Sequence, residues 1–172
     1  MVAGGVFKEQ LVKRRQTSKD SMKRYGLIFG VFVITVIAFM SPLAPFAPFI
    51  MFAAGFGAWF LMSYLKIEYE YAFTDGELDI DAIYNRSRRK RVFSARVNEI
   101  DIMAHVEDET HKHAFDSAQE TRDYSSGVVN DDTYAFLINY RGTRLKVIIE
   151  PNEVMLKAIA SVLTRRRLHV KV

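Results

Sequence analysis

The pattern of apolar and polar residues divides the chain into three regions. From Tyr25 to Leu65 apolar residues dominate, and no Asp, Glu, Lys or Arg occurs. After Leu65 apolar and polar residues alternate with a period of two, which is typical of strands with one buried face. Near the C-terminus apolar residues recur with helical spacing, at Met155, Ile159, Val162 and Leu163. We therefore expect an α+β protein, with two apolar helices followed by an antiparallel β-sheet and one amphipathic C-terminal helix.

The apolar region is too long for one membrane-spanning helix. As a single helix it would measure roughly 60 Å at about 1.5 Å per residue, whereas a hydrocarbon core is about 30 Å thick. Pro42, Pro45 and Pro48 interrupt the region, because proline removes a backbone donor and disfavours helix in the residue before it. We predict a transmembrane helical hairpin over residues 25–65, with spans at about 25–40 and 49–65.

Basic residues flank the apolar region and set its expected orientation. We interpret residues 1–24 as a basic arm at the membrane interface, carrying Lys13, Arg14, Arg15, Lys19, Lys23 and Arg24. The loop between the predicted spans is uncharged, and basic residues follow the second span. Because Lys and Arg flanks stay on the cytoplasmic side, we expect a multi-pass protein of the cytoplasmic membrane with both termini in the cytoplasm.

Two interpretations of the basic arm remain open. In the first, Val6, Phe7, Leu11 and Val12 form the apolar stripe of a short helix that lies in the membrane interface. In the second, the arm is only the orientation signal that the positive-inside rule requires.

Residues 66–172 are predicted to form one cytosolic domain that begins with a β-hairpin. Apolar and polar residues alternate on both sides of Asp75 and Gly76, and an Asp-Gly pair supplies the positive φ that a tight hairpin needs. Further strands are expected up to Val106. Two more are expected over residues 133–150, joined by an Arg-Gly turn.

The last third of the chain combines a polar segment with a helix. Residues 107–132 are predicted as a long loop with short strand or helical pieces near 114–120, since a structureless loop of this length is unusual in a compact domain. Residues 151–167 are predicted as the amphipathic helix, with Pro151 at its first position and Arg165–Arg167 in its last turn. The final "LHVKV" is predicted as a short strand or ordered tail.

The order of these elements resembles a known family. An antiparallel sheet that ends in one helix is the plan of pleckstrin-homology-like (PH-like) domains. The stretch "YEYAFTDGELDIDAIYNRSRRKRVFSARVNEIDIM" resembles bacterial PH-like domains, in which a Y-x-x-T-x-G-x-L hairpin follows two spans and leads into a basic turn. It is most similar to a family of small two-span membrane proteins of Gram-positive bacteria. The resemblance implies a fold and a compartment, but no catalytic residues.

A basic cluster directly after the first predicted hairpin is the main candidate site. It consists of Arg86, Arg88, Arg89, Lys90 and Arg91. One interpretation is a contact site for anionic lipid or a partner, since each basic residue near an acidic membrane adds about 1 kcal/mol of attraction. The other is a loop between strands whose arginines pair with Asp79, Asp81, Glu99 or other acids. Eukaryotic PH domains carry their basic motif mainly around the first hairpin loop, which is acidic here, so we do not expect phosphoinositide specificity.

No set of residues indicates catalysis, a cofactor or a metal. The chain has no cysteine, which excludes disulfides, thiolate ligands and cysteine nucleophiles. His111 and His113 lie near Asp108, Glu109 and Asp116 but lack a third ligand at a recognised spacing, so we expect solvated histidines. The excess positive charge lies in the arm, not in the predicted domain, which argues against a nucleic-acid partner. We therefore expect a protein that is not an enzyme and uses no cofactor.

Small residues in the predicted spans indicate close helix packing. Gly26 and Gly30 are four residues apart, as are Ala54 and Ala58, and this spacing lets helices approach closely. In one interpretation these residues pack the two spans together. In the other they mediate self-association or docking on a larger membrane partner.

The sequence thus favours a membrane-anchored, non-enzymatic binding or scaffold protein that presents a PH-like domain at the cytoplasmic face. Its edge strands would meet a protein partner or the lipid surface. The alternatives are an accessory subunit that docks through its helices and a peripheral sensor of anionic lipid. The expected partners are the bilayer and a protein partner or second copy, bound through the spans or a sheet edge.

Overall fold

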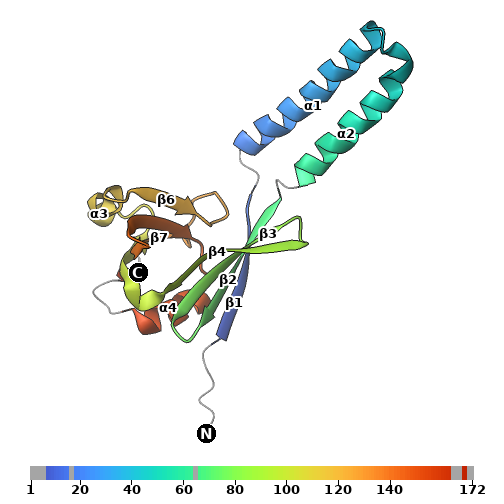
Figure 1. The fold of residues 1–172 in the computed structure, drawn as a ribbon. Coiled ribbons are helices and arrows are strands. Elements are labelled where there is room, and N and C mark those ends of the chain that lie inside the picture. The colour runs from blue at the N-terminus through green and yellow to red at the C-terminus, as the bar shows by residue number, and fades with distance from the viewer. Residues whose placement is uncertain (1–6, 16–17, 64–65, 164–167, 170–172) are drawn as a thin grey trace.

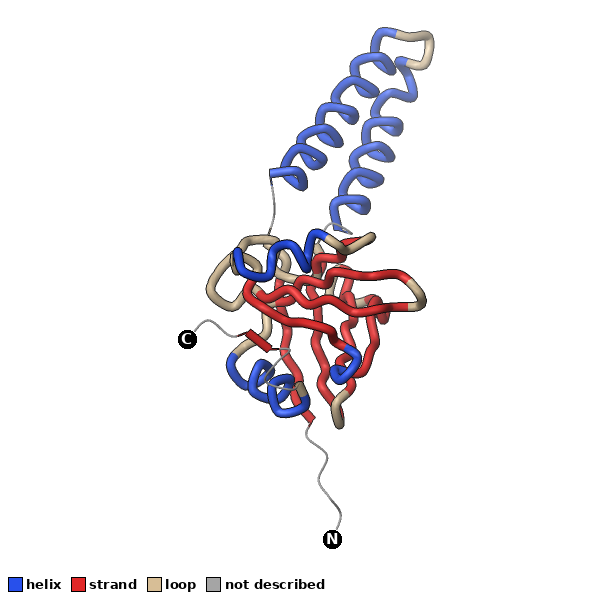
Figure 2. Tube along the Cα trace, turned by 90° about the vertical axis from the view of Figure 1, so that its left-hand side faces the viewer, coloured by secondary structure: helices blue, strands red, loops and turns tan. Residues whose placement is uncertain are grey.

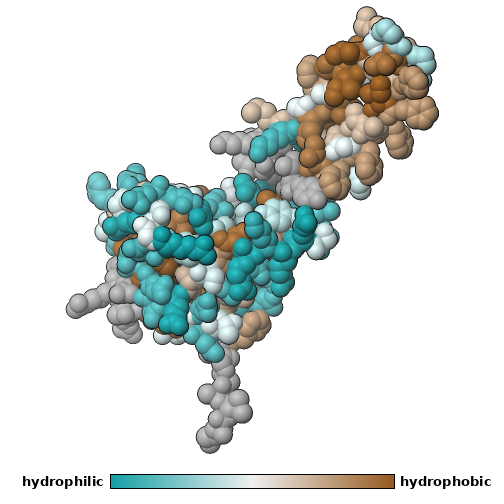
Figure 3. Space-filling view, in the orientation of Figure 1, coloured by the Kyte–Doolittle hydropathy of each residue, from teal (hydrophilic) through white to brown (hydrophobic). Residues whose placement is uncertain are grey.

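The computed structural model describes residues 7–15, 18–63, 66–163 and 168–169. A helical hairpin projects from a domain built of two β-sheets and a C-terminal helix (Figure 1). The predicted α+β architecture is therefore confirmed. Figure 3 shows the division in chemical character, with a hydrophobic hairpin beside a largely hydrophilic domain.

The hairpin consists of α1 (Ser18–Met40) and α2 (Ala47–Ser63), joined through a short 3-10 helix at Ala44–Phe46. The break between them contains Pro42 and Pro45, as predicted, whereas Pro48 lies in the first turn of α2. The segments Ser21–Met40 and Ala44–Ser63 are long and apolar enough to cross a membrane. The helix α1 begins earlier than the predicted span, because its basic first turns are helical too.

Four strands form the first sheet, in the order β1-β2-β3-β4 with antiparallel neighbours. They are β1 (Phe7–Lys13), β2 (Ile67–Thr74), β3 (Glu77–Tyr84) and β4 (Arg88–Arg96). The Asp-Gly hairpin between β2 and β3 is confirmed, with φ values of 49° at Asp75 and 88° at Gly76.

The strand β1 overturns the interfacial helix that was considered for the basic arm. It pairs with β2 along its whole length, from Phe7 opposite Thr74 to Lys13 opposite Glu68. Val12 is buried while Leu11 is exposed, which is the alternation of a strand. A domain boundary at residue 66 is therefore wrong, because it omits this strand. In effect, β1 and β2 form a β-hairpin whose connection is the entire helical hairpin.

The second sheet has the strand order β6-β8-β7-β5-β9. Its strands are β5 (Ile100–His105), β6 (Glu120–Asp123), β7 (Tyr134–Tyr140), β8 (Thr143–Ile149) and β9 (Leu168–His169). The pairs β5–β7 and β7–β8 are antiparallel, whereas β6–β8 and β5–β9 are parallel. The predicted strands over 133–150 and the short terminal strand are confirmed. So are the short elements within the long polar segment, namely α3 (Lys112–Asp116) and β6.

The C-terminal helix α4 (Glu153–Val162) is shorter than predicted. Its N-cap is Asn152, whose side chain accepts a hydrogen bond from the Met155 amide. Pro151 therefore precedes the cap rather than occupying the first helical position. The predicted last turn, Arg165–Arg167, lies outside the described residues.

The main core lies between the two sheets and α4. Its largest fully buried residues include Tyr71, Phe73, Phe93, Phe136 and Ile138. A smaller apolar cluster around Phe115 lies where α3 packs against the other face of β7. Figure 2 shows the sheets wrapped around this interior, with α4 at the end of the domain away from the helical hairpin.

Candidate binding surface

The basic cluster begins in the turn between β3 and β4. Asn85 and Arg86 have φ values of 48° and 56°, and the Ser87 amide donates to the Tyr84 carbonyl at 3.1 Å. Two successive positive φ values define a type I′ turn, in which glycine is favoured at the position of Arg86. The remaining basic residues, Arg88 to Arg91, belong to β4. The prediction that they form a loop is therefore wrong.

Replacing Arg86 by glycine is expected to raise the free energy of unfolding by about 1 kcal/mol. The left-handed conformation costs an L-residue about 1–2 kcal/mol, whereas glycine adopts it freely. The ion pair that is lost, with Glu68 at 3.5 Å, joins an exposed guanidinium and contributes little. Thermal unfolding of the detergent-solubilised protein measures the change. Arg88→Gly, in the adjoining strand, is the control and should destabilise; a loss of stability in Arg86→Gly would contradict the interpretation.

Strand geometry separates the cluster into two faces. Arg89 and Arg91 lie on the outer face of the first sheet, where Arg89 pairs with Glu70. Arg91 pairs with Asp79 at 3.0 Å and with Asp81 at 3.2 Å. The predicted pairing with these two aspartates is therefore confirmed for Arg91. Within the described residues, Glu99 forms no ion pair with the cluster.

The charged side chains on this face shift the pKa values of Arg91 and Glu70. The hydrogen bond to Asp81, together with the charge of Asp79, raises the pKa of Arg91. A hydrogen bond shared with Glu9 raises the pKa of Glu70, burial raises it further, and the charge of Arg89 opposes both effects. The outer-face arginines thus neutralise a row of closely spaced acids, which is a structural role.

Arg88 and Lys90 lie on the opposite face of β4, beside Tyr84 and Ala82 of β3. Both side chains are exposed. In the part of the chain that the structure describes, neither forms an ion pair. These two residues are therefore available to a ligand, whereas Arg86 at the tip of the turn pairs with Glu68 at 3.5 Å.

The turn lies directly beside the base of α2. The Asn85 amide donates to the Lys66 carbonyl at 3.0 Å. A cavity of about 480 Å³ separates the turn from the last turns of α2, and its lining comprises Phe56, Trp59, Phe60, Ser63, Tyr84, Asn85, Ser87 and Arg88. Arg88 is therefore held next to the end of an apolar helix.

The base of α1 is tied to the domain on the other side. The Arg14 amide donates to the Ile67 carbonyl at 3.2 Å, and the Arg15 amide donates to the Ser126 carbonyl at 2.7 Å. Glu150 holds the same loop, since its carboxylate accepts from the Ser126 amide at 3.0 Å and from Asn130 Nδ2 at 2.7 Å. Burial raises the pKa of Glu150, but these hydrogen bonds and the charge of Arg15 lower it overall.

These contacts define one surface, which we call the hairpin-facing surface. Its basic members are Arg14, Arg15, Lys66, Arg86, Arg88 and Lys90. The loop held by Glu150 adds two exposed apolar side chains, Val128 and Val129. Sequence reasoning missed the two valines, because their loop is joined to Arg15 by a tertiary contact, the hydrogen bond from the Arg15 amide to the Ser126 carbonyl.

The other predicted arm and span residues are placed as follows. Lys13 ends β1, and Lys23 and Arg24 are exposed on α1, whereas the side chain of Lys19 lies outside the description. Ala58 is buried and Ala54 is partly buried. A Cβ added at Gly26 or Gly30 would meet no described atom within 4 Å. The two glycines therefore do not mediate a close approach between α1 and α2.

The histidines whose side chains are described do not assemble a metal site with the acids around them. His105 is buried, accepts from the Glu107 amide through Nδ1 at 3.2 Å and lies 3.0 Å from the Asn130 carbonyl through Nε2. His111 pairs with Asp108 at 2.8 Å, which lowers the pKa of Asp108. Among the described residues, no group of three or more potential ligands is close enough to hold a metal ion.

Comparison with known proteins supports the fold directly. A family model described as "Bacterial PH-like domain (DUF6106)" matches residues 5–168. The match therefore includes β1, the helical hairpin and both sheets. No curated protein and no solved structure matches the chain.

Proposed function

Since the chain belongs to a family of bacterial PH-like domains, we propose that it is a membrane-anchored, non-enzymatic binding protein that contacts anionic lipid. The helical hairpin anchors it in the membrane, and the hairpin-facing surface lies against the headgroups. The observation that carries the proposal is the position of Arg88 and Lys90, which form no ion pair among the described residues. Arg88 lies at the base of α2, and Lys90 follows it on the same face of β4.

The pairing of β1 with β2 supports a two-span anchor with both flanks on one side. The strand β1 precedes α1, and β2 follows α2. Because the two strands pair in one domain, the chain must return through α2 to the side of the membrane that it left through α1. The basic residues before α1 and after α2 favour the cytoplasm as that side. The proposed topology is therefore a multi-pass protein with both termini in the cytoplasm.

Charge and aromatic residues at the base of the hairpin fit an interface with acidic lipid. Each of the basic residues on the hairpin-facing surface would add about 1 kcal/mol near an anionic membrane. Tyr25 and Trp59 are exposed near the domain-side ends of α1 and α2, where aromatic rings favour the headgroup level. Val128 and Val129 add apolar contacts at the same level.

A nitroxide at the β3–β4 turn tests the lipid contact. The chain has no cysteine, so Ser87→Cys carries the label at a single position. We expect the nitroxide to relax faster beside a lipid-anchored nickel chelate when nanodiscs contain anionic lipid than when they contain neutral lipid. The reason is that anionic headgroups draw the turn toward the bilayer.

A charge-matched pair of double variants provides the control. Arg88→Gln with Lys90→Gln should abolish the difference between anionic and neutral nanodiscs. Arg89→Gln with Arg91→Gln removes the same charge from the outer face and should preserve it. Equal effects of the two pairs would reject the lipid contact and leave net charge as the explanation.

A second candidate function is docking on a membrane partner or a second copy through α1. The observation that favours it is the open face at Gly26 and Gly30, where an added Cβ would meet no described atom beyond the helix's own backbone within 4 Å. Purification in mild detergent after crosslinking tests it. Recovery of a discrete complex that Gly30→Leu abolishes would support docking through the helix, whereas recovery of the single chain from both proteins would reject it.

A further inference from the structure

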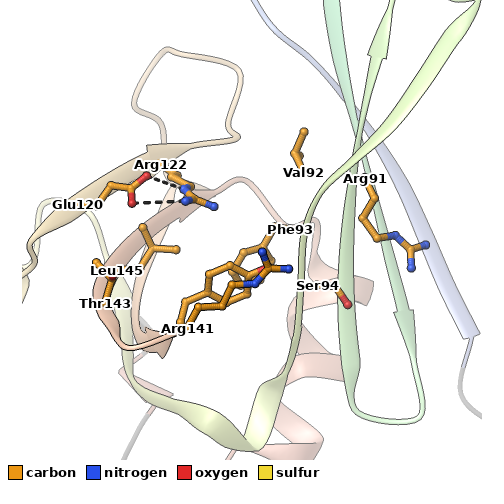
Figure 4. Close-up of a pocket in the computed structure, with 10 residues that line it drawn as sticks. Arg91, Val92, Phe93, Ser94, Glu120, Arg122, Arg141, Thr143 and Leu145 are labelled. Carbon is orange, nitrogen blue, oxygen red and sulfur yellow. Dashed lines mark hydrogen bonds and ion pairs between the residues drawn. The ribbon is translucent and has the colours of Figure 1, made fainter.

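We propose that the cleft between β4 and β6 binds a small anionic ligand with a flat or apolar body, and that Arg141 is its main anion contact. Each of these strands is the edge of its own sheet, so the cleft lies where the two sheets part (Figure 4). Its volume is about 450 Å³, which is within the range of sites for small molecules. The site lies apart from the hairpin-facing surface and does not depend on the proposed lipid contact.

The floor of the cleft is apolar and aromatic. Phe93 and Tyr140 stack with their ring centroids 5.2 Å apart, and Leu145 borders them. Phe93 and Leu145 are each only 1% exposed, so the floor is held rigidly by the core. Thr143 adds a hydroxyl group to the lining, whereas the Ser94 hydroxyl donates to Glu77 at 3.0 Å. A flat or apolar ligand body would find contact area here and hydrogen-bonding groups at the edge.

Two arginines supply the positive charge of the cleft. Arg122 is held by Glu120, which accepts from Nε at 2.7 Å and from Nη2 at 3.3 Å. The guanidinium of Arg141 lies 5.2 Å from the centre of the Tyr140 ring, and within the described residues it forms no ion pair. The cleft therefore contains one acid, Glu120, and two arginines, Arg122 and Arg141. This excess of positive charge favours a ligand with a carboxylate or phosphate group.

Arg91 also borders the cleft but takes no part in this charge. Figure 4 shows its side chain directed away from Arg122 and Arg141. It is instead engaged by Asp79 and Asp81 on the outer face. Arg141 is therefore the cleft arginine that is free to meet an incoming anion.

The backbone at Arg141 gives independent support. Arg141 and Gly142 have φ values of 54° and 84° and form the turn between β7 and β8. At the first position of such a turn asparagine, aspartate or glycine is preferred. The requirements of the turn do not explain an arginine here, whereas anion binding does. Arg141→Asn is thus a variant that should retain the turn and the fold.

The experiment uses the full-length protein in nanodiscs of neutral lipid, with phenyl phosphate as the probe. Saturation-transfer NMR titration should detect binding of phenyl phosphate and weaker binding of inorganic phosphate, which lacks the ring, and of phenol, which lacks the charge. Arg141→Asn should weaken phenyl phosphate binding at least about tenfold, because charge-assisted hydrogen bonds are the strong ones. Arg144→Gln, an exposed arginine outside the lining, should bind as the parent does.

Three outcomes would overturn the proposal. The first is unchanged phenyl phosphate binding in Arg141→Asn, and the second is binding of phenol as strong as that of phenyl phosphate. The third is binding of an acidic peptide, lost in Arg141→Asn, by a protein that does not bind phenyl phosphate, which would assign the cleft to a protein partner. Repeating the titration with anionic nanodiscs identifies the natural source of the anion. Competition by the bilayer would indicate a lipid headgroup, and unchanged affinity a soluble molecule.

Discussion

Joining Arg14 to Ile67 through an Asn-Gly pair, in place of residues 15–66, is expected to yield a water-soluble domain with the native fold. The Arg14 amide already bonds to the Ile67 carbonyl, so these residues are placed to close a two-residue turn. Asn-Gly is the preferred sequence for such a turn. A fragment of residues 66–172, by contrast, is expected not to fold.

The joined domain contains β1, whereas the fragment of residues 66–172 lacks it. Val12 is buried in the main core, and burying such a side chain contributes about 1.5–3 kcal/mol. The side chain of Gln10 donates to the Glu150 carbonyl at 2.8 Å and accepts from the Asn152 amide at 2.7 Å, each bond contributing about 1 kcal/mol. Together with the pairing to β2, these contacts approach the 5–15 kcal/mol that stabilises a typical domain.

Dispersion of amide resonances and cooperative thermal unfolding measure the outcome. The control is the joined domain with Val12→Asp, which places a charge on the inner face and should prevent folding. A charged residue on the outer face, Leu11→Lys, should be tolerated, because Leu11 is exposed and lies opposite Glu70. If residues 66–172 fold as stably as the joined domain, the strand β1 is not an integral part of the fold.

Phe136→Ala is expected to lower the free energy of unfolding by about 3–5 kcal/mol, the usual cost of removing a large aromatic side chain from a core. Phe136 has no exposed surface, and its ring centroid lies 5.8 Å from that of Phe93 on the facing sheet. Truncation leaves a cavity between the two sheets that the surrounding side chains fill only in part.

Denaturant or thermal unfolding of the detergent-solubilised protein measures this loss. Phe7→Ala is the matched control, because Phe7 on β1 is 58% exposed and should change stability by less than about 0.5 kcal/mol. Similar losses in both variants would mean that Phe136 does not occupy the centre of the core.

The sequence predicted the helices and most strands, because their signals are local. An uncharged region broken by prolines admits few interpretations, and alternation around Asp-Gly identifies a hairpin within a few residues. The strand β1 was missed since a segment as short as Phe7–Lys13 fits both helical and strand spacing. Its partner β2 lies beyond the helical hairpin, so no local pattern indicates the pairing.

The candidate sites were less accessible to prediction. The alternation of β4 determines which basic residues meet acids, but the sequence alone did not show that Arg88–Arg91 lie in a strand. Without the strand assignment, the sequence does not indicate that Arg88 and Lys90 lie on one face and Arg89 and Arg91 on the other. The cleft forms because β4 and β6, which are edges of different sheets, lie close together in the fold. No local sequence pattern indicates that Arg141 and Phe93 line the same cleft.

The interrupted hairpin of β1 and β2 also governs the order in which the protein can assemble. Synthesis makes β1 first, yet its partner appears only after both helices, and closing a loop of this length carries an entropic cost. Under the proposed topology, insertion of α1 and α2 brings Arg14 and Ile67 to the same side of the bilayer and thereby offsets part of that cost. Insertion is then a folding step of the domain itself. A chain that fails to insert leaves the edge of β2 unpaired, and such an edge is the kind of surface that leads to aggregation.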